Sequence, residues 1–444
     1  MMRSTFKAHS LAALMCTLAI LVGSGCDDGG TGTGGNGGSG GAGGGAAASR
    51  SDAYATAICD NTFNCCNTAD LAEVFKGVTN VVDYAGCHIF YRTVWDAAIE
   101  TQIADSKAKG RLDFNESAFG ECLQYLSEKA CGEPVNAPEA CSNMFVGKVD
   151  NGGACATPLE CKSTNCVIDN GQAEGSCADA PTPSAQGGAC GEDQPCDTGL
   201  YCKAGQCAPK ELDGVTCQGN NECQSGTCAG ANPGACKTIC SGGGPGPGAV
   251  DADLDGIGAA IVNAECDKIF NCCTAEEQKT KLFTGTDTKI ECSALLGVFM
   301  SQGLITLHNS KVQGKTVVNG TALADCIDSY AAASCDDYAK GNGFQCMSAI
   351  LGQGALGTTC AGDHECESSF CDSSQGETAI CNTLPGANDA CSGSCAKGLY
   401  CDNNTCIAQK TVGTNCNGSN ECLEGECYSD GSAPTTCTLI CNGI

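Results

Sequence analysis

Cysteines dominate the residues of this sequence that could do chemistry, since 42 of its 444 residues are cysteine. Cysteines bind metals as thiolates, act as nucleophiles, or pair as disulfides. No C-x-x-C spacing occurs, and outside the N-terminal leader the histidines are His88, His308 and His364. Structural zinc sites usually combine such short spacings with histidines. We therefore expect disulfides, which persist outside the reducing cytoplasm.

The N-terminus predicts export. Arg3 and Lys7 precede an apolar run at residues 11–22, as in a secretory signal peptide. A helix of this length is about 18 Å long, too short to cross roughly 30 Å of hydrocarbon. The run is therefore a leader rather than a membrane span.

The end of this run indicates a lipid anchor. Gly23-Ser24-Gly25-Cys26 resembles the bacterial lipobox, whose cysteine is diacylated and becomes the mature N-terminus, although Gly23 stands where that motif usually has leucine. The resemblance implies a signal peptide at residues 1–25, lipidation of Cys26, and a membrane as partner through this anchor.

Cysteine parity supports lipidation independently. Cys16 lies in the leader, and if Cys26 carries lipid, forty of the 42 cysteines remain, an even number that can pair completely. Residues 26–50 then form a tether, because glycine-rich chain cannot bury enough apolar surface to fold. About twenty such residues reach about 25 Å, enough to hold a folded body away from lipid headgroups.

The rest of the chain contains one cysteine pattern twice. Residues 59–66 (CDNTFNCC) correspond to residues 266–273 (CDKIFNCC), and every cysteine in residues 51–240 has a counterpart in residues 258–441. Twenty cysteines against twenty, in the same order, predict a duplication whose disulfides close within each copy. The first copy holds Cys59, Cys65, Cys66, Cys87, Cys122, Cys131, Cys141, Cys155, Cys161, Cys166, Cys177, Cys190, Cys196, Cys202, Cys207, Cys217, Cys223, Cys228, Cys236 and Cys240. The second holds Cys266, Cys272, Cys273, Cys292, Cys326, Cys335, Cys346, Cys360, Cys366, Cys371, Cys381, Cys391, Cys395, Cys401, Cys406, Cys416, Cys422, Cys427, Cys437 and Cys441.

Each copy begins with a predicted helical domain, at residues 51–149 and 251–354. Proline-free segments rich in Ala, Leu and Glu predict its helices, at 52–66, 69–76, 81–107 and 117–129 and at 255–273, 275–282, 291–312 and 321–334. Cys59 and Cys66 are seven positions apart and so share one helix face, while Cys65 points elsewhere. We expect these cysteines to connect the first helix to two neighbours.

Each copy ends in three short cysteine modules, at residues 150–240 and 355–444. Their recurring C-x5-C spacing with glycine at the entry predicts small loops and β-hairpins, each held by two bridges, since pieces of this size need crosslinks. Thirteen cysteines is an odd number, so one must reach back to the helical domain, and Cys240 is the candidate. The sequence does not determine the pairing. Residues 241–250, rich in glycine and proline, predict a hinge between the copies.

The fold class we expect is small disulfide-rich plus α: two tandem copies of a disulfide-stapled helical bundle followed by cysteine-rich modules with short β-hairpins. Gly199-Leu200-Tyr201-Cys202 and Gly398-Leu399-Tyr400-Cys401, within their cysteine frames, resemble the N-terminal cysteine-rich pattern of Dickkopf proteins. The whole plan resembles the cysteine-rich lipoproteins of myxobacteria, which carry a lipobox, a Gly/Ser tether and such modules. The Dickkopf resemblance implies a protein or cell-surface partner, and no individual binding residue carries over.

One segment has the spacing of a metal site. Asp251, Asp253 and Asp255, followed by Gly256, match the opening of a calcium loop, in which oxygen ligands precede a turning glycine. Position 12 of such a loop is Val262 here rather than a bidentate glutamate. The alternative is an acidic linker end that caps a helix beginning near Gly256. Calcium is the one cofactor that we name.

The remaining composition disfavours several functions. A net charge of −28 disfavours nucleic acid as a partner. No G-x-S-x-G or H-E-x-x-H motif occurs, and complete cysteine pairing would leave no catalytic thiol. Sequons at Asn115, Asn319, Asn403 and Asn417 keep a eukaryotic glycoprotein open, while the leader favours bacteria.

We therefore predict a non-enzymatic, lipid-anchored protein of the cell envelope, on the outer membrane, the periplasmic face or the cell surface, or an extracellular protein. It would act as a protein-binding, surface-binding or structural module. The alternatives are a secreted enzyme or enzyme inhibitor with a site in one helical domain, and an envelope protein without a specific ligand.

Overall fold

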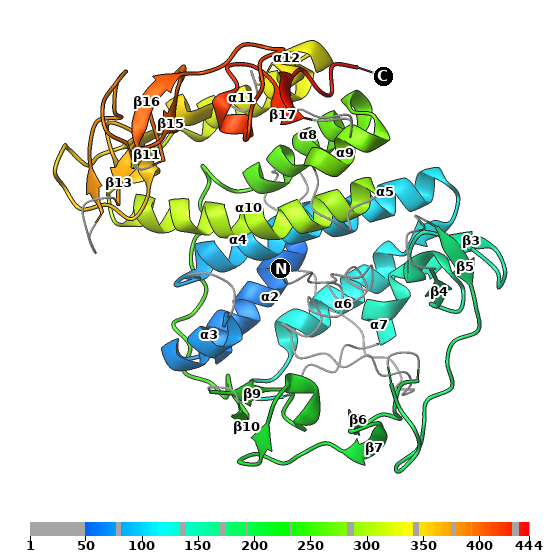
Figure 1. The fold of residues 1–444 in the computed structure, drawn as a ribbon. Helices are drawn as coiled ribbons and strands as arrows, with labels where there is room; N and C mark the ends of the chain where they lie inside the picture. The colour runs from blue at the N-terminus through cyan, green and yellow to red at the C-terminus, as the bar shows by residue number, and fades with distance from the viewer. Residues whose placement is uncertain are drawn as a thin grey trace. The chain divides into compact units, whose positions relative to one another are not determined.

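The structure of the chain, a computed structural model, divides into two compact units, unit 1 at Met1–Val250 and unit 2 at Asp251–Ile444 (Figure 1). The predicted leader, Cys26 and the tether up to residue 48 lie outside the described residues, whereas Ser49 and Arg50, which the prediction placed in the tether, cap and begin the first helix. These are residues 49–443 apart from 77–80, 134–138, 169–171, 173, 192–193, 231–232, 282–287, 341–345, 374–378, 392 and 429–434.

Unit 1 begins with helices α2 (Arg50–Cys65), α3 (Thr68–Val74), α4 (Tyr84–Val94), α5 (Thr101–Ala108), α6 (Glu116–Glu128) and α7 (Glu139–Asn143). The π-helix η1 (Trp95–Glu100) joins α4 to α5 without a break, so the helix predicted at 81–107 contains a widened turn. Ser49, Asn67, Asp83 and Asn115 cap four of the helices by accepting hydrogen bonds from first-turn N–H groups. These groups have no acceptor within the helix, so the caps stabilise the helix starts.

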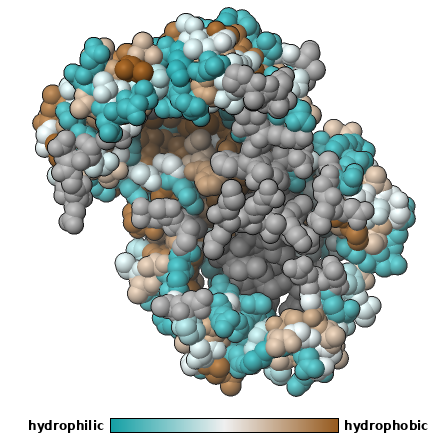
Figure 2. Space-filling model, viewed as in Figure 1, coloured by the Kyte–Doolittle hydropathy of each residue, from teal (hydrophilic) through white to brown (hydrophobic). Residues whose placement is uncertain are grey.

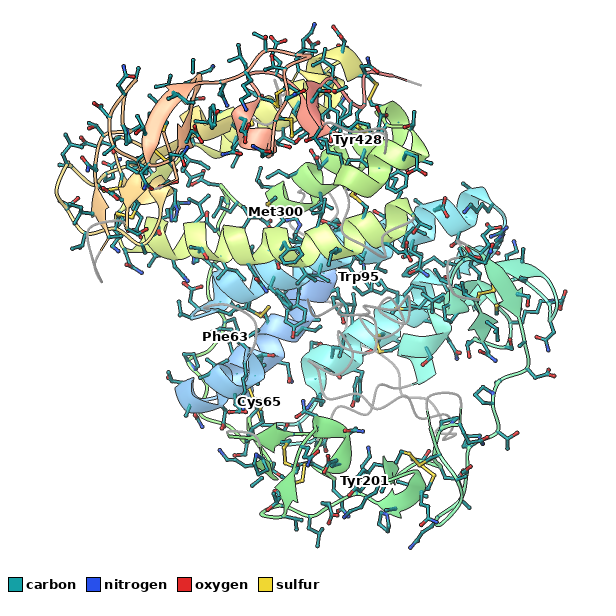
Figure 3. The ribbon with its side chains drawn as sticks, viewed as in Figure 1. Phe63, Cys65, Trp95, Tyr201, Met300 and Tyr428 are labelled. Atoms are coloured by element: carbon teal, nitrogen blue, oxygen red, sulfur yellow. A yellow bond between two sulfur atoms is a disulfide. The ribbon has the colours of Figure 1, made fainter. Side chains whose placement is uncertain are left out.

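An apolar core forms where η1 and α5 meet α6. It contains Trp95, Ile99, Ile103, Leu112 and Phe119, all of them buried. The ring of Trp95 lies 5.6 Å from that of Phe119, and Figure 3 shows Trp95 among these helices. Burial of large apolar side chains is the main source of stability in such a cluster.

Unit 2 begins with helices α8 (Ile257–Cys272), α9 (Ala275–Lys281), α10 (Lys289–Val312), α11 (Gly320–Ala332) and α12 (Cys335–Ala339). α8 follows Gly256, which has a φ of +77° and needs glycine's freedom. No side chain caps this helix start, so the acidic cap expected near Gly256 is wrong. α10 begins at a capping box formed by Thr288 and Glu291.

Among the described residues, α10 is the one helix long and apolar enough to cross a membrane by length and composition. Half of its most apolar window is buried in the fold.

Short antiparallel sheets make up the rest of both units. β1 (Leu112–Phe114) pairs with β2 (Phe145–Gly147), and β11 (Thr316–Val318) pairs with β12 (Ile350–Gly352), so that the last strand of each helical part precedes its modules in the chain. The modules of unit 1 contain β3 (Ala154–Cys155), β4 (Cys166–Val167), β5 (Gly175–Cys177), β6 (Leu200–Lys203), β7 (Gln206–Pro209), β8 (Thr216–Cys217), β9 (Cys228–Ala229) and β10 (Gly234–Cys236). Those of unit 2 contain β13 (Cys371–Asp372), β14 (Ile380–Cys381), β15 (Leu399–Asp402), β16 (Thr405–Ala408), β17 (Glu426–Tyr428) and β18 (Thr436–Thr438). The prediction of a disulfide-rich fold with helices and short hairpins is confirmed.

The modules share one local geometry. Each opens on a turn that ends in a residue with positive φ, a conformation that favours glycine or asparagine. These residues are Gly152, Gly187, Gly214, Gly357, Asn388 and Gly413. In five modules an isolated parallel bridge then joins the second cysteine to the residue twelve positions before it. The bridges are Val149–Cys161, Ser184–Cys196, Glu211–Cys223, Gly354–Cys366 and Lys410–Cys422.

The first half of residues 241–250 lies against α2 in unit 1. Gly242, Gly244 and Gly246 donate backbone hydrogen bonds of 2.8–3.2 Å to the last turn of that helix. A Cβ at Gly244 would lie 2.0 Å from the carbonyl oxygen of Phe63, so no side chain fits there. This half of the linker is therefore fixed to unit 1, and the hinge between the units stays a prediction.

Candidate functional site

All forty cysteines that follow Cys26 pair as disulfides, and each pair lies within one unit. Four pairs of unit 1 involve the helical part: Cys59–Cys87, Cys65–Cys131, Cys66–Cys240 and Cys122–Cys141. Four pairs of unit 2 do the same: Cys266–Cys292, Cys272–Cys335, Cys273–Cys441 and Cys326–Cys346. Cys240 is thus the cysteine that reaches back from the modules, as expected.

The arrangement around the first helix differs from the expected one. Cys66 lies beyond the end of α2 in extended conformation, with φ −96° and ψ 121°. Cys59 and Cys66 therefore do not share a helix face, so that part of the prediction is wrong. The two cysteines inside α2, Cys59 and Cys65, do connect the helix to two neighbours. The three cysteines connect the α2 region to α4, to the segment after α6 and to the end of the third module.

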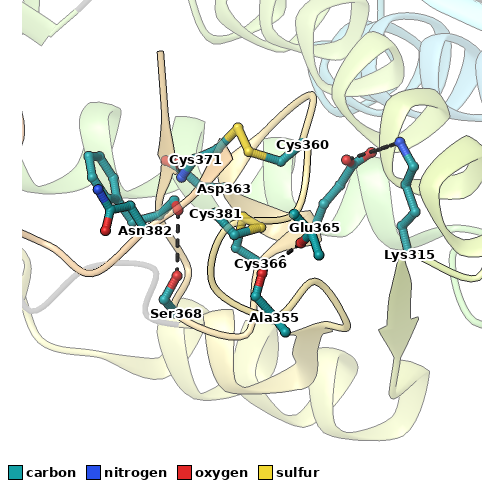
Figure 4. Close-up of a disulfide and its surroundings, with 12 residues drawn as sticks. Lys315, Ala355, Cys360, Asp363, Glu365, Cys366, Ser368, Cys371, Cys381 and Asn382 are labelled. Atoms are coloured by element: carbon teal, nitrogen blue, oxygen red, sulfur yellow. Dashed lines mark hydrogen bonds and ion pairs between the residues drawn. A yellow bond between two sulfur atoms is a disulfide. The ribbon is translucent and has the colours of Figure 1, made fainter. Parts of the chain in front are cut away.

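Within every module the first cysteine pairs with the third and the second with the fourth. Unit 1 has Cys155–Cys166, Cys161–Cys177, Cys190–Cys202, Cys196–Cys207, Cys217–Cys228 and Cys223–Cys236. Unit 2 has Cys360–Cys371, Cys366–Cys381, Cys391–Cys401, Cys395–Cys406, Cys416–Cys427 and Cys422–Cys437. Figure 4 shows two of these crossed pairs, in the first module of unit 2.

Groups of three module sulfurs lie close enough together to suit a metal ion, within 4.8 Å of one another. Each of these sulfurs is bonded to a second cysteine and is not a thiolate, which is the form that ligates metals. In the oxidised chain these clusters therefore hold the modules together. In three modules the buried core consists of cysteines alone, for example Cys217, Cys223 and Cys236.

A buried glutamate attaches the first module of unit 1 to the helices. The side chain of Glu160 is 0 % exposed. It accepts hydrogen bonds from Ser106 Oγ at 2.6 Å and from the backbone N–H of Ala156 at 2.7 Å. Arg111 lies 3.5 Å from the same carboxylate. These partners compensate the cost of burying a charge.

Unit 2 repeats this attachment with Glu365. Ser310 Oγ donates to Glu365 at 2.9 Å and Ala361 N–H donates at 2.9 Å. The ammonium of Lys315 lies 3.2 Å from the same carboxylate, as Figure 4 shows. Burial opposes ionisation, but these donors and the Lys315 charge hold the pKa of Glu365 below its ordinary value.

Our reading of the sequence missed these glutamates, although a signal was present. A glutamate precedes the second cysteine of four modules, at Glu160, Glu222, Glu365 and Glu421. In each case its carboxylate accepts a hydrogen bond from the backbone N–H four residues earlier. The Glu-Cys pair therefore marks a turn, and in the first module of each unit it also reaches the helices.

Ser310, His364 and Glu365 are the residue types of a hydrolytic triad, but their order differs. Ser310 Oγ lies between His364 Nε2, at 2.8 Å, and Glu365, at 2.9 Å. In a serine hydrolase the imidazole lies between hydroxyl and carboxylate. Ser310 is also buried, and Ser106 makes the same contact with Glu160 where Leu159 stands in place of His364. We assign Ser310 a positioning role.

The three aspartates of the candidate calcium loop lie at the start of unit 2. Asp251 is buried, with His308 Nδ1 2.7 Å from one carboxylate oxygen and Lys311 Nζ 2.6 Å from the other. Lys311 also pairs with Asp253. Burial raises the pKa of Asp251, but the contacts with His308 and Lys311 outweigh it and hold this pKa at about 2.

The geometry of this cluster favours an internal ion pair over the calcium loop named from the sequence. The ammonium of Lys311 contacts two of the three carboxylates that calcium would need. The backbone N–H of Asp255 donates to the carbonyl of Asp251 at 2.9 Å in the turn before α8.

No protein-family model, no curated protein and no solved structure matches this chain. The resemblances to Dickkopf modules and to myxobacterial lipoproteins stay predictions.

Proposed function

We propose that this chain is an exported protein of the cell envelope, anchored by lipid on Cys26 and made of two copies of one disulfide-closed unit. Its cysteine modules would contact a protein or another component of the cell surface, or build the surface structurally. The observation that carries the proposal is the complete pairing of forty cysteines. Such a set persists only in an oxidising compartment.

The duplication is supported by details beyond the cysteine spacing. Ser106 and Ser310 contact Glu160 and Glu365 in the same way. The long closing disulfides, with sequence separations of 174 and 168, connect the end of the first helix to the end of the last module in each unit. Two such closed units on one tether would offer two binding surfaces to one partner layer.

Repeated exposed residues support a contact surface on the modules. On the face shown in Figure 2, hydrophilic and near-neutral residues cover much of the area over β15, β16 and β17. Leu356 and Val412, at 61 and 48 % exposure, stand immediately before the positive-φ glycine of their module turns, and Leu212, at 63 % exposure, stands two residues before Gly214. One exposed aliphatic side chain needs no function, but an exposed aliphatic side chain within two residues of the turn glycine recurs in three modules.

Mass spectrometry of the chain extracted from membranes tests the anchor. We expect a mature protein that begins at diacylated Cys26 and has no titratable thiol. The variant Cys26→Ser should leave the membrane fraction. A chain that retains residues 1–25, or that stays membrane-bound after Cys26→Ser, would contradict the anchor.

A binding assay tests the surface role. Labelled Cys26→Ser chain is added to intact cells of the producing organism, and the bound fraction is compared with that of Leu212→Ser, Leu356→Ser and Val412→Ser combined. We expect at least tenfold less binding for the triple variant. The matched control combines Val82→Ser, Val317→Ser and Leu351→Ser, which are exposed by 69, 51 and 55 % outside the modules. An equal loss of binding in the two triple variants would contradict a role of the module turns. If the Cys26→Ser chain without further substitutions does not bind, the structural role is favoured.

A further inference from the structure

Unit 1 contains a cavity between its helices and its third module. Its volume is about 200 Å³. Buried Ile58, Tyr91 and Leu126 supply apolar walls, together with the disulfides Cys65–Cys131 and Cys66–Cys240 at the end of α2. Pockets for drug-sized ligands span roughly 300–1,000 Å³, whereas a cavity of about 150 Å³ holds one benzene ring. The space therefore suits a single ring.

Polar groups line one side of this cavity. Asn61 and Thr62 are among the lining residues, and Asn61 Nδ2 donates to the carbonyl of Lys129 at 2.7 Å. The half-buried ammonium of Lys129 donates to the carbonyl of Glu133, and burial lowers the pKa of this lysine. A bound ring with one polar substituent would thus meet both donors and acceptors.

Unit 2 has different side chains at the corresponding positions. Equivalent cysteines show which residues of the two units correspond. Ile58 corresponds to Glu265, because they directly precede Cys59 and Cys266. Leu126 corresponds to Tyr330, because they follow Cys122 and Cys326 by four residues. In unit 1 the side-chain amide of Asn61 donates to the carbonyl of Lys129, and in unit 2 the ammonium of Lys268 donates to the carbonyl of Ala333. Both bonds link corresponding positions of the two units. The two places are therefore equivalent.

Two phenolic rings meet at one carboxylate in unit 2, and one of them, Tyr330, stands at the position of Leu126. Tyr330 and Tyr338 both donate their hydroxyls to Glu265, the second at 3.0 Å, and both rings are buried. Burial, reinforced by the Glu265 charge, raises the pKa of both hydroxyls. Unit 1 has leucine in place of Tyr330 and isoleucine in place of Glu265, so it lacks the ring and its acceptor but keeps the surrounding disulfides.

We propose that the cavity of unit 1 binds a small single-ring phenol, whose ring takes the place that Tyr330 fills in unit 2. The ring would pack on Ile58, Tyr91 and Leu126. Because isoleucine stands here in place of the Glu265 that accepts the Tyr330 hydroxyl, the hydroxyl of the ligand would turn instead to Asn61 and Lys129, which line the same cavity. This site is independent of the envelope role proposed above, because it needs only the folded chain.

The test uses the full Cys26→Ser chain and 4-methylphenol, the side-chain analogue of tyrosine, in a calorimetric or ligand-observed NMR titration. Toluene serves as the probe without the hydroxyl. We expect a Kd on the order of 1 mM or tighter for 4-methylphenol, as the small number of atoms in the ligand allows. Toluene should bind at least threefold more weakly.

Leu126→Tyr gives unit 1 the residue that unit 2 has at this position, so that a tyrosine ring competes for the space of the ligand. It should weaken binding of 4-methylphenol at least tenfold. Tyr330→Leu is the matched control in unit 2 and should leave that affinity unchanged or add a second site. Lys129→Met should reduce the preference for 4-methylphenol over toluene. Shifts of the Ile58 and Leu126 methyl resonances locate the probe in the unchanged chain, so the proposal stays testable if Leu126→Tyr does not fold. No binding, binding that leaves these methyls unshifted, or full affinity in folded Leu126→Tyr would overturn it.

Discussion

In the helical part of unit 1, Trp95, Ile103 and Phe119 pack into an apolar core, whereas the buried cluster of the third module consists of Cys217, Cys223 and Cys236. A module of roughly 25–35 residues cannot bury enough surface to fold without crosslinks. The helical part also carries disulfides, but they join elements that already bury apolar side chains. Oxidation is therefore a condition of folding in the modules and an added constraint in the helices.

Complete reduction of the disulfides should produce the largest difference in stability between the modules and the helical part. The modules should lose amide protection altogether, because their buried clusters are sulfur. The helical part should retain part of its helical circular dichroism, because its apolar core remains. Hydrogen exchange with and without reductant measures both, and persistent protection of β6 and β7 after reduction would contradict the contrast.

The next effect concerns the closing disulfide. Cys66→Ala with Cys240→Ala opens a loop with a sequence separation of 174, for which the chain-entropy model predicts a loss of about 5 kcal/mol. Cys217→Ala with Cys228→Ala, at a separation of 11, is the control, with about 3 kcal/mol expected and confined to its module. Denaturant unfolding followed by Trp95 fluorescence, the signal of the single tryptophan, should shift for the first pair and barely for the second. A larger shift for Cys217→Ala with Cys228→Ala than for Cys66→Ala with Cys240→Ala would show that the modules stabilise the helical core.

A core substitution tests the other side of the comparison. Trp95→Ala should lower the free energy of unfolding of unit 1 by about 3–5 kcal/mol, since it removes a large buried side chain. Circular dichroism at the helical band measures the loss. The disulfides of the modules should still form, and incomplete module oxidation in this variant would argue that the modules need the helices to fold.

The smallest effect lies at the contact between the two regions. Glu365→Gln should cost unit 2 about 1–3 kcal/mol, because Lys315 loses its partner while the hydrogen bonds are weakened. Glu365 has a lowered pKa, so its contribution to stability is present above the ordinary glutamate pKa of about 4.3 and is lost as pH falls through the lowered value. Thermal unfolding between pH 7 and pH 2 should show a smaller acid-induced loss in Glu365→Gln than in the unchanged chain. Asp251→Asn offers a comparison, since the contribution of Asp251 is lost as pH falls through its pKa of about 2.

Much of this architecture was predictable from cysteine arithmetic. An odd count of thirteen module cysteines required one long-range pair, and Cys240 makes it with Cys66. The extended conformation of Cys66 was not predictable, because helix ends depend on the chain that follows, and here the segment at 242–246 is hydrogen-bonded to the last turn of α2. The buried Glu160 and Glu365 were missed because one glutamate among 51 acidic residues carries no sign of its partners until the fold places Ser106 and Ser310 beside it.

The π-helical turn at Trp95 and the cavity were also beyond sequence pattern. Both depend on how side chains of separate helices share space. The equivalent disulfides Cys122–Cys141 and Cys326–Cys346 place Leu126 and Tyr330 at corresponding positions. Only the folded chain shows that Leu126 lines a cavity.

Disulfide mapping by mass spectrometry of the non-reduced protein is the most direct test of this account. We predict twenty crosslinks, all within a unit, with Cys66–Cys240 and Cys273–Cys441 as the closing pairs. Free thiols among the forty cysteines, or crosslinks that join residues before 250 to residues after it, would contradict it.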